Sequence, residues 1–180
     1  MKSWPYWLAA TLILAGIIHI VAILLWPSFV MDRLISGLEA RSALNVAIHT
    51  PRADENARTV VRPSPDLIYT ICAFDVSQRP LAISAPVPQE TYFSLSMFAD
   101  NTDNFFVVND KQLTKDIVEV VLVKDEAQVT ELGGPPVVVA PSERGVLLFR
   151  TLIQSEDRFD TLDAIRKQAR CETLSPAPQS

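Results

Sequence analysis

The sequence is poor in glycine, histidine and cysteine. Its 180 residues include five glycines, two histidines and two cysteines. It contains no G-x-G-x-x-G or G-x-x-x-x-G-K-[S/T] run, which excludes the usual dinucleotide and P-loop fingerprints. Two histidines and two cysteines are too few for a multi-ligand metal cluster. We therefore expect neither a metal nor another cofactor. The composition indicates no catalytic residue.

Positive charge is also scarce. Lys and Arg total 16 against 21 Asp and Glu, which gives a net charge of −5 and a pI near 5.0. A nucleic-acid-binding domain needs a basic face, so no nucleic-acid partner is expected. The length corresponds to one domain on the usual scale of roughly 100–200 residues.

One long apolar run stands out near the N-terminus. Residues 8–26 carry no charged side chain, and about 20 such residues cross the hydrocarbon core of a bilayer. Aromatic residues, which favour membrane interfaces, flank the run as Trp4, Tyr6, Trp7 and Trp26. A cleaved signal peptide is the alternative, but the run is longer than the usual apolar region and no A-x-A site follows it. We expect residues 1–27 to form an uncleaved transmembrane signal anchor.

The segment after this anchor is expected to be a membrane-proximal helix and connection, residues 28–58. Residues 28–48 repeat apolar side chains at three-to-four spacing, with Met31, Leu34, Ile35 and Leu38 on one stripe. This helix is either a stalk or the first helix of the domain. Residues 49–66 are polar and contain three prolines, so they indicate a connection, with a short strand over Thr59–Arg62.

From Leu67 onward the pattern is that of β-strands. Short runs rich in Val, Ile, Phe and Tyr alternate with turn-forming segments, and no helical crossover separates most of them, which favours antiparallel pairing. The fold predicted for residues 59–171 is therefore mainly β, an antiparallel β-sandwich of jelly-roll-like type. The expected strands lie within 67–74, 79–87, 91–99, 105–110, 117–124, 135–140 and 145–153.

The C-terminal part of the domain is predicted to hold one amphipathic helix, Ser155–Cys171. Phe159, Leu162, Ile165 and Ala169 recur at helical spacing, and Ser155 is a candidate N-cap. Arg166, Lys167 and Arg170 lie near its end, where the helix dipole favours cations. The Pro-rich residues 172–180 are expected to be a disordered tail.

A ligand-binding face is suggested by the strand over residues 91–99. Alternation places Tyr92, Ser94, Ser96 and Phe98 on one face, and this mixed face is a candidate groove. The following loop adds Asp100 and Asp103 to the candidate ligand-binding residues. The loop also has oxygen groups suited to Ca²⁺, but Asp and Asn equally form tight turns through their own backbone, and we favour the turn.

Other polar residues have structural and functional interpretations. Asp66 and Asp75 border a strand. They form either turn contacts, such as one between Asp75 and Arg79, or a carboxylate cluster with Asp100 for acid–base chemistry. Glu119 and Arg150 interrupt apolar strands, and we expect them to pair across neighbouring strands. The alternatives are simple exposure, or an arginine that grips a carboxylate or phosphate.

Residues 64–110 carry the most specific pattern in the chain. Its landmarks are Ser64-Pro65-Asp66, the strand with Tyr69, Phe74-Asp75-Val76 before a turn at Pro80, and an aromatic strand ending in Ala99-Asp100. This run resembles the bacterial domain-of-unknown-function family twelve-fifty-four, in its short single-pass inner-membrane form. The resemblance implies no established activity.

The same resemblance implies a layout and a place in the cell. Larger members look like two-domain β-sandwich proteins, whereas this chain stops near the point where the second domain would start. The resemblance therefore implies a companion small membrane protein that carries the missing second domain. Charges around the anchor leave its orientation undecided, and the resemblance favours a periplasmic C-terminal domain.

A periplasmic domain would make Cys72 and Cys171 a candidate disulfide. Disulfides persist in oxidising compartments, and two cysteines suffice for one bridge. If the domain were cytoplasmic, two separate thiols would be favoured instead.

The leading hypothesis from the sequence is a single-pass inner-membrane protein whose periplasmic β domain pairs with a companion membrane protein. That pair would act in envelope maintenance or assembly. The second hypothesis is a periplasmic module that binds a sugar, lipid or small hydrophobic ligand on the Tyr92 face. The third is a hydrolase that uses Asp66, Asp75 or Asp100, which requires at least two of these carboxyls to lie close together. An enzyme is the less favoured class.

Overall fold

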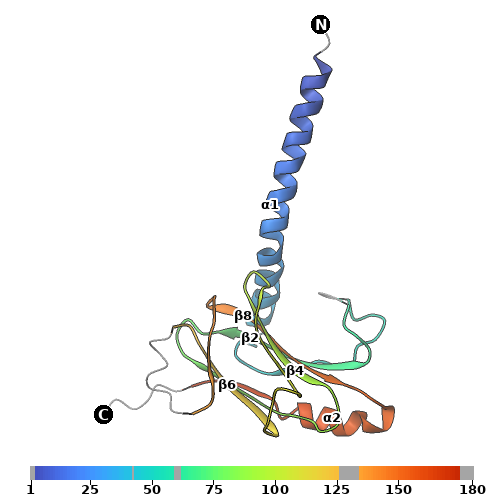
Figure 1. The fold of residues 1–180 in the computed structure, drawn as a ribbon, viewed down its shortest axis with the longest axis vertical. Helices are drawn as coiled ribbons and strands as arrows, with labels where there is room; N and C mark the ends of the chain where they lie inside the picture. Colours follow the sequence, from blue (N-terminus) through green and yellow to red (C-terminus); the bar gives the residue numbers. More distant parts are fainter. Residues whose placement is uncertain (1–2, 42, 59–61, 126–133, 175–180) are drawn as a thin grey trace, which may run out of the picture.

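The computed structural model describes residues 3–41, 43–58, 62–125 and 134–174. The predicted strand over Thr59–Arg62 falls almost entirely outside these residues, as does the part of the predicted tail after residue 174. The described chain forms one long helix, two β-sheets packed face to face and a short second helix (Figure 1).

The N-terminal helix α1, Trp4–Glu39, is longer than either segment predicted for this region. It runs without a break through Pro27, across the boundary expected between the anchor and the following helix. Its first part is exposed throughout, and it is long and apolar enough to cross a membrane. Its last turns carry the predicted stripe, in which Met31 and Ile35 are buried. The segments predicted as anchor and as membrane-proximal helix are therefore one element.

The chain leaves α1 earlier than predicted, since the expected helix over 28–48 ends at Glu39. Leu44 forms a β-bridge with Ala73, and β1 follows at Ile48–His49. Asn45 adopts a left-handed backbone (φ 56°), which Asn tolerates better than most residues. Its side chain both donates to the carbonyl of Asp75 and accepts from the amide of Asp75. These bonds turn the chain from the helix into the sheet.

The larger sheet, here called sheet A, has the strand order β1-β2-β8-β4-β5. Its remaining strands are β2 (Leu67–Asp75), β8 (Arg144–Leu152), β4 (Phe93–Ala99) and β5 (Asn104–Asn109). Sheet B has the order β7-β6-β3-β9, with β7 (Val137–Val139), β6 (Ile117–Val123), β3 (Leu81–Pro86) and β9 (Arg170–Thr173). All strand pairs are antiparallel except β6 and β7. The seven predicted runs all contain strands, which confirms the mainly β sandwich.

The predicted helix Ser155–Cys171 is wrong at both ends. A 3-10 turn occupies Glu156–Arg158, helix α2 spans only Phe159–Arg166, and β9 begins at Arg170. Ser155 precedes the turn but makes no capping bond through its side chain. In β9 burial alternates along the strand, so Cys171 points inward. The first residues of the predicted tail, Glu172 and Thr173, belong to this strand and are ordered by pairing with β3.

The core lies between the two sheets, where apolar residues from both inner faces interdigitate. Large side chains with less than 2% exposure come from both layers, including Phe74, Leu95 and Leu147 of sheet A and Leu81 and Leu122 of sheet B. The disulfide between Cys72 and Cys171 connects β2 to β9, and therefore joins the two sheets inside the core. The candidate cysteine pair of the sequence analysis is bonded in the structure.

Gly145 marks a place where the core tolerates no side chain. A Cβ atom built there would lie 2.2 Å from the carbonyl oxygen of Phe98 and 2.5 Å from the ring of Phe74. We expect Gly145→Ala to lower the free energy of unfolding by about 1–3 kcal/mol, the usual cost of overpacking. Thermal unfolding in neutral detergent measures this, and Gly37→Ala serves as control because nothing lies within 4 Å of its Cβ position. Equal midpoints for the wild type and Gly145→Ala would contradict the packing.

Candidate functional site

The outward side of sheet A is the surface on which the predicted ligand-binding residues fall. Side chains alternate along each strand, so Phe93, Leu95 and Met97 enter the core while Ser94 and Ser96 face outward. We call the outward-facing side chains of β2, β8 and β4 the outer face. It includes Tyr69 and Ile71 of β2, which lie opposite Arg150 and Leu148 of β8, respectively.

Helix α1 covers one end of this outer face. Its Met31 and Ile35 pack with Ala73 and Val146, and Phe98 of β4 borders the same cluster. The carboxylate of Glu39 accepts from Arg144 at 2.6 Å and closes the contact. Figure 1 shows α1 rising from the side of the sandwich that carries β2, β8 and β4, with β6 on the far side. Phe98 therefore belongs to a helix-docking contact and is unavailable to a ligand.

The other end of the outer face centres on Arg150. Its Nη2 donates to Ser96 Oγ at 2.6 Å, and in the β4–β8 register it lies directly opposite Ser94. The predicted pair between Arg150 and Glu119 is wrong, because β8 belongs to sheet A and β6 to sheet B. Glu119 is exposed and lies opposite Ser84. Sheet membership, which strand patterns alone do not fix, separates these two charges.

Two polar atoms in this cluster are buried without a hydrogen-bond partner, namely Arg150 Nε and Ser94 Oγ. No carboxylate among the described residues lies within ion-pair distance of the Arg150 guanidinium. Buried polar groups are usually satisfied, and an exception needs an explanation. The cluster can therefore accept an anionic oxygen ligand at the guanidinium.

The remaining candidate residues do not join this cluster. Tyr92 is 41% exposed at the end of β4 that lies away from α1, whereas Asp100 and Asp103 follow the opposite end. Asn101 donates to the Asp103 carboxylate at 2.7 Å and accepts from the Asp103 amide, and Thr102 has φ 73°. This is the tight β4–β5 turn that we favoured from the sequence. A single groove lined by Tyr92, Ser94, Ser96, Asp100 and Asp103 is not formed.

The full cluster of Asp66, Asp75 and Asp100 expected for a hydrolase is not assembled, because Asp66 lies away from the other two. Asp66 and Asp75 border opposite ends of the nine-residue strand β2, about 30 Å apart at 3.3 Å per residue. The Asp75 carboxylate accepts from the Ser77 amide at 2.9 Å and lies 3.9 Å from Arg144. The expected Asp75–Arg79 contact is thus replaced by a cross-strand pair. Asp100 also lies beyond the α1-proximal end of sheet A, where its amide donates to Ser142.

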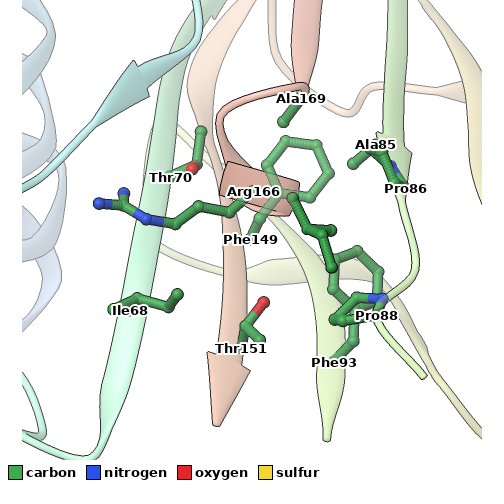
Figure 2. A pocket seen from close by; sticks show the side chains of 11 residues that line it. Ile68, Thr70, Ala85, Pro86, Pro88, Phe93, Phe149, Thr151, Arg166 and Ala169 are labelled. Carbon is green, nitrogen blue, oxygen red and sulfur yellow. The ribbon is translucent and has the colours of Figure 1, made fainter. Parts of the chain in front are cut away.

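The sandwich interior offers little room for a ligand. The cavity in Figure 2 is lined by Ile68, Thr70, Phe93 and Phe149 among others. Its volume is about 10 Å³, at the lower limit for one water molecule. Arg166 borders it, but its guanidinium points away, toward β1 and β2. Ligand binding inside the sandwich, as in barrels with an open lumen, is not supported by this cavity.

Arg166 holds a polar cluster that sequence analysis missed. Only 8% exposed, it donates to the carbonyls of Tyr69 at 2.7 Å and Thr50 at 2.8 Å, and it pairs with Asp163. Burial alone raises the pKa of Asp163, but hydrogen bonds from Lys167 and Arg166 more than offset this and lower it overall. The helical position of Arg166 gave no signal of these contacts with segments more than 90 residues earlier.

His49, which the sequence placed in the connection, belongs to β1 and lies beside this cluster. Its Nδ1 is 2.9 Å from the Thr70 hydroxyl. Burial lowers the pKa of the imidazole below its ordinary 6.5, and the positive charges of Arg166, Arg170 and Lys167 lower it further against the opposing Asp163. Within the described residues, no group of three or more metal-binding side chains gathers here or elsewhere.

This lowered pKa predicts acid sensitivity. Between the folded pKa of His49 and 6.5, the unfolded chain binds the proton more readily than the folded one. The stability contributed by neutral His49 is therefore complete above pH 6.5 and is lost as the pH falls toward the folded pKa. We expect His49→Gln to show a smaller loss of unfolding midpoint between pH 7.5 and 5.5 than the wild type. Identical pH profiles would contradict the assignment.

Together these observations define a class: a two-sheet β-sandwich with a long apolar N-terminal helix docked on sheet A. The profile of the protein family of unknown function DUF1254 matches residues 44–173, and the chain belongs to that family. The match begins where the chain leaves α1 and ends with β9. No curated protein matches the chain.

Two solved structures share the fold. The VPA0106 protein from Vibrio parahaemolyticus has a TM-score of 0.59 at 14% identity, over 86% of this chain and 40% of that one. An uncharacterised protein from Burkholderia cenocepacia has a TM-score of 0.50 at 15% identity, over 85% of this chain and 43% of that one. The present chain therefore spans less than half the length of either structure.

Proposed function

We propose that this chain is a single-pass inner-membrane protein whose periplasmic sandwich works as one half of a pair, in envelope maintenance or assembly. Helix α1 carries the proposal. It continues from an apolar stretch long enough to cross a membrane directly into a contact with sheet A. Such a helix would fix the orientation of the domain relative to the bilayer, as an anchored scaffold requires and a flexible tether would not provide.

The disulfide supports the proposed compartment. Cys72 and Cys171 are both buried and join the two sheets, and disulfides of this structural kind persist in oxidising compartments such as the periplasm. Together with the anchor, this favours a C-terminal domain outside the cytoplasm.

The comparison structures support the proposed pairing. Each extends well beyond the part that matches this chain, which covers 40% and 43% of their lengths. We propose that a companion membrane protein supplies a second module in place of that additional part. The companion would meet a sandwich whose position is set by α1.

Purification of the tagged full chain from native membranes in a gentle detergent tests this pairing. We expect mass spectrometry to find one membrane protein in a stoichiometric amount. A chain that elutes alone and monodisperse would contradict the pairing. Ile35→Ala, which loosens the buried α1 contact, should reduce recovery of the companion, whereas Phe29→Ala at an exposed position of the same helix should not.

A further inference from the structure

The outer face carries a cation that no described residue neutralises. Arg150 is half-buried, and a guanidinium has five N–H donors. Among the described residues, the Arg150 side chain makes one hydrogen bond, from Nη2 to Ser96 Oγ, while its Nε is buried without a partner. A partly desolvated charge of this kind is costly unless an opposite charge and further hydrogen bonds satisfy it. The guanidinium is therefore matched to an anion with several acceptor oxygens.

The charge of the surrounding surface points the same way. Among the outward-facing side chains of β2, β8 and β4, Asp75 is the single carboxylate, and it faces Arg144. The whole chain, in contrast, has a net charge of −5. The outer face is thus apolar and cationic on an otherwise acidic protein. An approaching anion would meet little repulsion there.

The position of the outer face next to the docked helix α1 indicates that the anion is a lipid headgroup. Helix α1 docks at Val146, four residues from Arg150 along β8, about 13 Å away. Met31, which is docked on the sheet, lies five positions after Trp26 at the end of the apolar run, about 8 Å of helical rise further on. If α1 spans the bilayer, the outer face lies close to the headgroups. Exposed Tyr92 (41%) and Val107 (54%) lie beside it, as amphipathic and apolar groups do at membrane interfaces.

We propose that Arg150, which lies over the fully buried Ser96 and Ser94, binds the phosphate group of an anionic lipid headgroup. The forked N–H groups of arginine suit the paired oxygens of a phosphate. The buried Ser96 hydroxyl accepts from the guanidinium and orients it, and the buried Ser94 lies directly across the strand pair beneath it. The inference rests on the membrane anchoring in the proposed function, and it is independent of the companion protein.

Titration of the purified full chain in neutral detergent tests this site. The probes are dioctanoyl phosphatidylglycerol, dioctanoyl phosphatidylcholine and inorganic phosphate, and the readout is the shift of the thermal unfolding midpoint. We expect a saturable increase with phosphatidylglycerol at concentrations where the other two have little effect. Arg150→Gln should weaken the apparent affinity by about tenfold or more, as expected for loss of a charged hydrogen-bonded partner.

Two further variants keep the test decisive. Arg79→Gln removes the same charge at an exposed turn outside the outer face and should bind as the wild type does. Arg150→Lys keeps the positive charge but loses the forked N–H groups of the guanidinium. This variant should fold as the wild type does and bind phosphatidylglycerol several-fold more weakly. An unchanged affinity in both Arg150 variants would overturn the proposal. Equal responses to phosphatidylcholine would show that headgroup charge is not recognised, and equal responses to inorganic phosphate would assign the site to free anions; either result also overturns it.

Because the titration uses the purified chain, its outcome is separate from that of the co-purification. Loss of the companion with retained phosphatidylglycerol binding would reject the pairing and keep the lipid site. Recovery of the companion without a response of the purified chain to phosphatidylglycerol would keep the pairing and reject the lipid site.

Discussion

Reduction of the Cys72–Cys171 disulfide is expected to lower the free energy of unfolding by roughly 4–5 kcal/mol. The two cysteines are 99 residues apart, so the bond restricts most of the unfolded domain. It also joins β2 and β9, which belong to different sheets. A loss of this size approaches the whole stability of a typical domain. Denaturant unfolding in neutral detergent, with and without reductant, measures it.

The double variant Cys72→Ala/Cys171→Ala is the control for this prediction. It should unfold near the midpoint of the reduced wild type and should not respond to reductant. An unchanged midpoint in the reduced wild type would mean that packing between the sheets alone holds the sandwich, and would contradict the prediction.

The second large effect is expected at Arg166. Arg166→Met keeps much of the side-chain volume but removes the donor to the Thr50 carbonyl and one of the donors to the Tyr69 carbonyl, which also accepts from the Thr50 amide and hydroxyl. It also leaves Asp163 with Lys167 alone. Removing one partner of a nearly buried pair costs about 3–5 kcal/mol, and the remaining Lys167 contact puts the expected loss near the lower end. Denaturant unfolding at pH 7.5 measures it.

Arg170→Met provides the matched comparison. Arg170 is exposed, and within the part of the chain that the structure describes its side chain donates to two carbonyls of its own turn, those of Lys167 and Ala169. Its substitution should change the free energy of unfolding by less than about 0.5 kcal/mol, as at most surface positions. Equal losses in the two variants would show that charge, rather than the buried contacts of Arg166, determines the effect.

The strands were predictable because their pattern is local. A period of two and turn-forming residues between runs placed all seven predicted strands. β9 was missed since it has only four residues and directly follows a helix. Helical spacing through Ala169 then extended the predicted helix over residues that alternate in burial.

The polar contacts were less predictable because they depend on register and sheet membership. Asp75 lies directly opposite Arg144 in the β2–β8 pair, a relation that spacing along the chain does not reveal. Glu119 and Arg150 were predicted to pair because each interrupts an apolar strand, but their strands belong to different sheets. The carbonyl partners of Arg166 are Thr50, directly after β1, and Tyr69 of β2, which lie 116 and 97 residues earlier in the chain. Its role at the end of α2 therefore required the fold.

We propose that α1 anchors a sandwich that lies on the oxidising side of the membrane. The most direct test of this proposal is to quench living cells with acid, alkylate free thiols with a maleimide–polyethylene glycol reagent, and assay the carbonate-washed membrane pellet. We predict that the full chain stays in the pellet, uncleaved, and that its two cysteines react only after reduction. Two freely reactive thiols would show that the sandwich is not in an oxidising compartment, and a shortened chain in the soluble fraction would show that α1 is not an anchor.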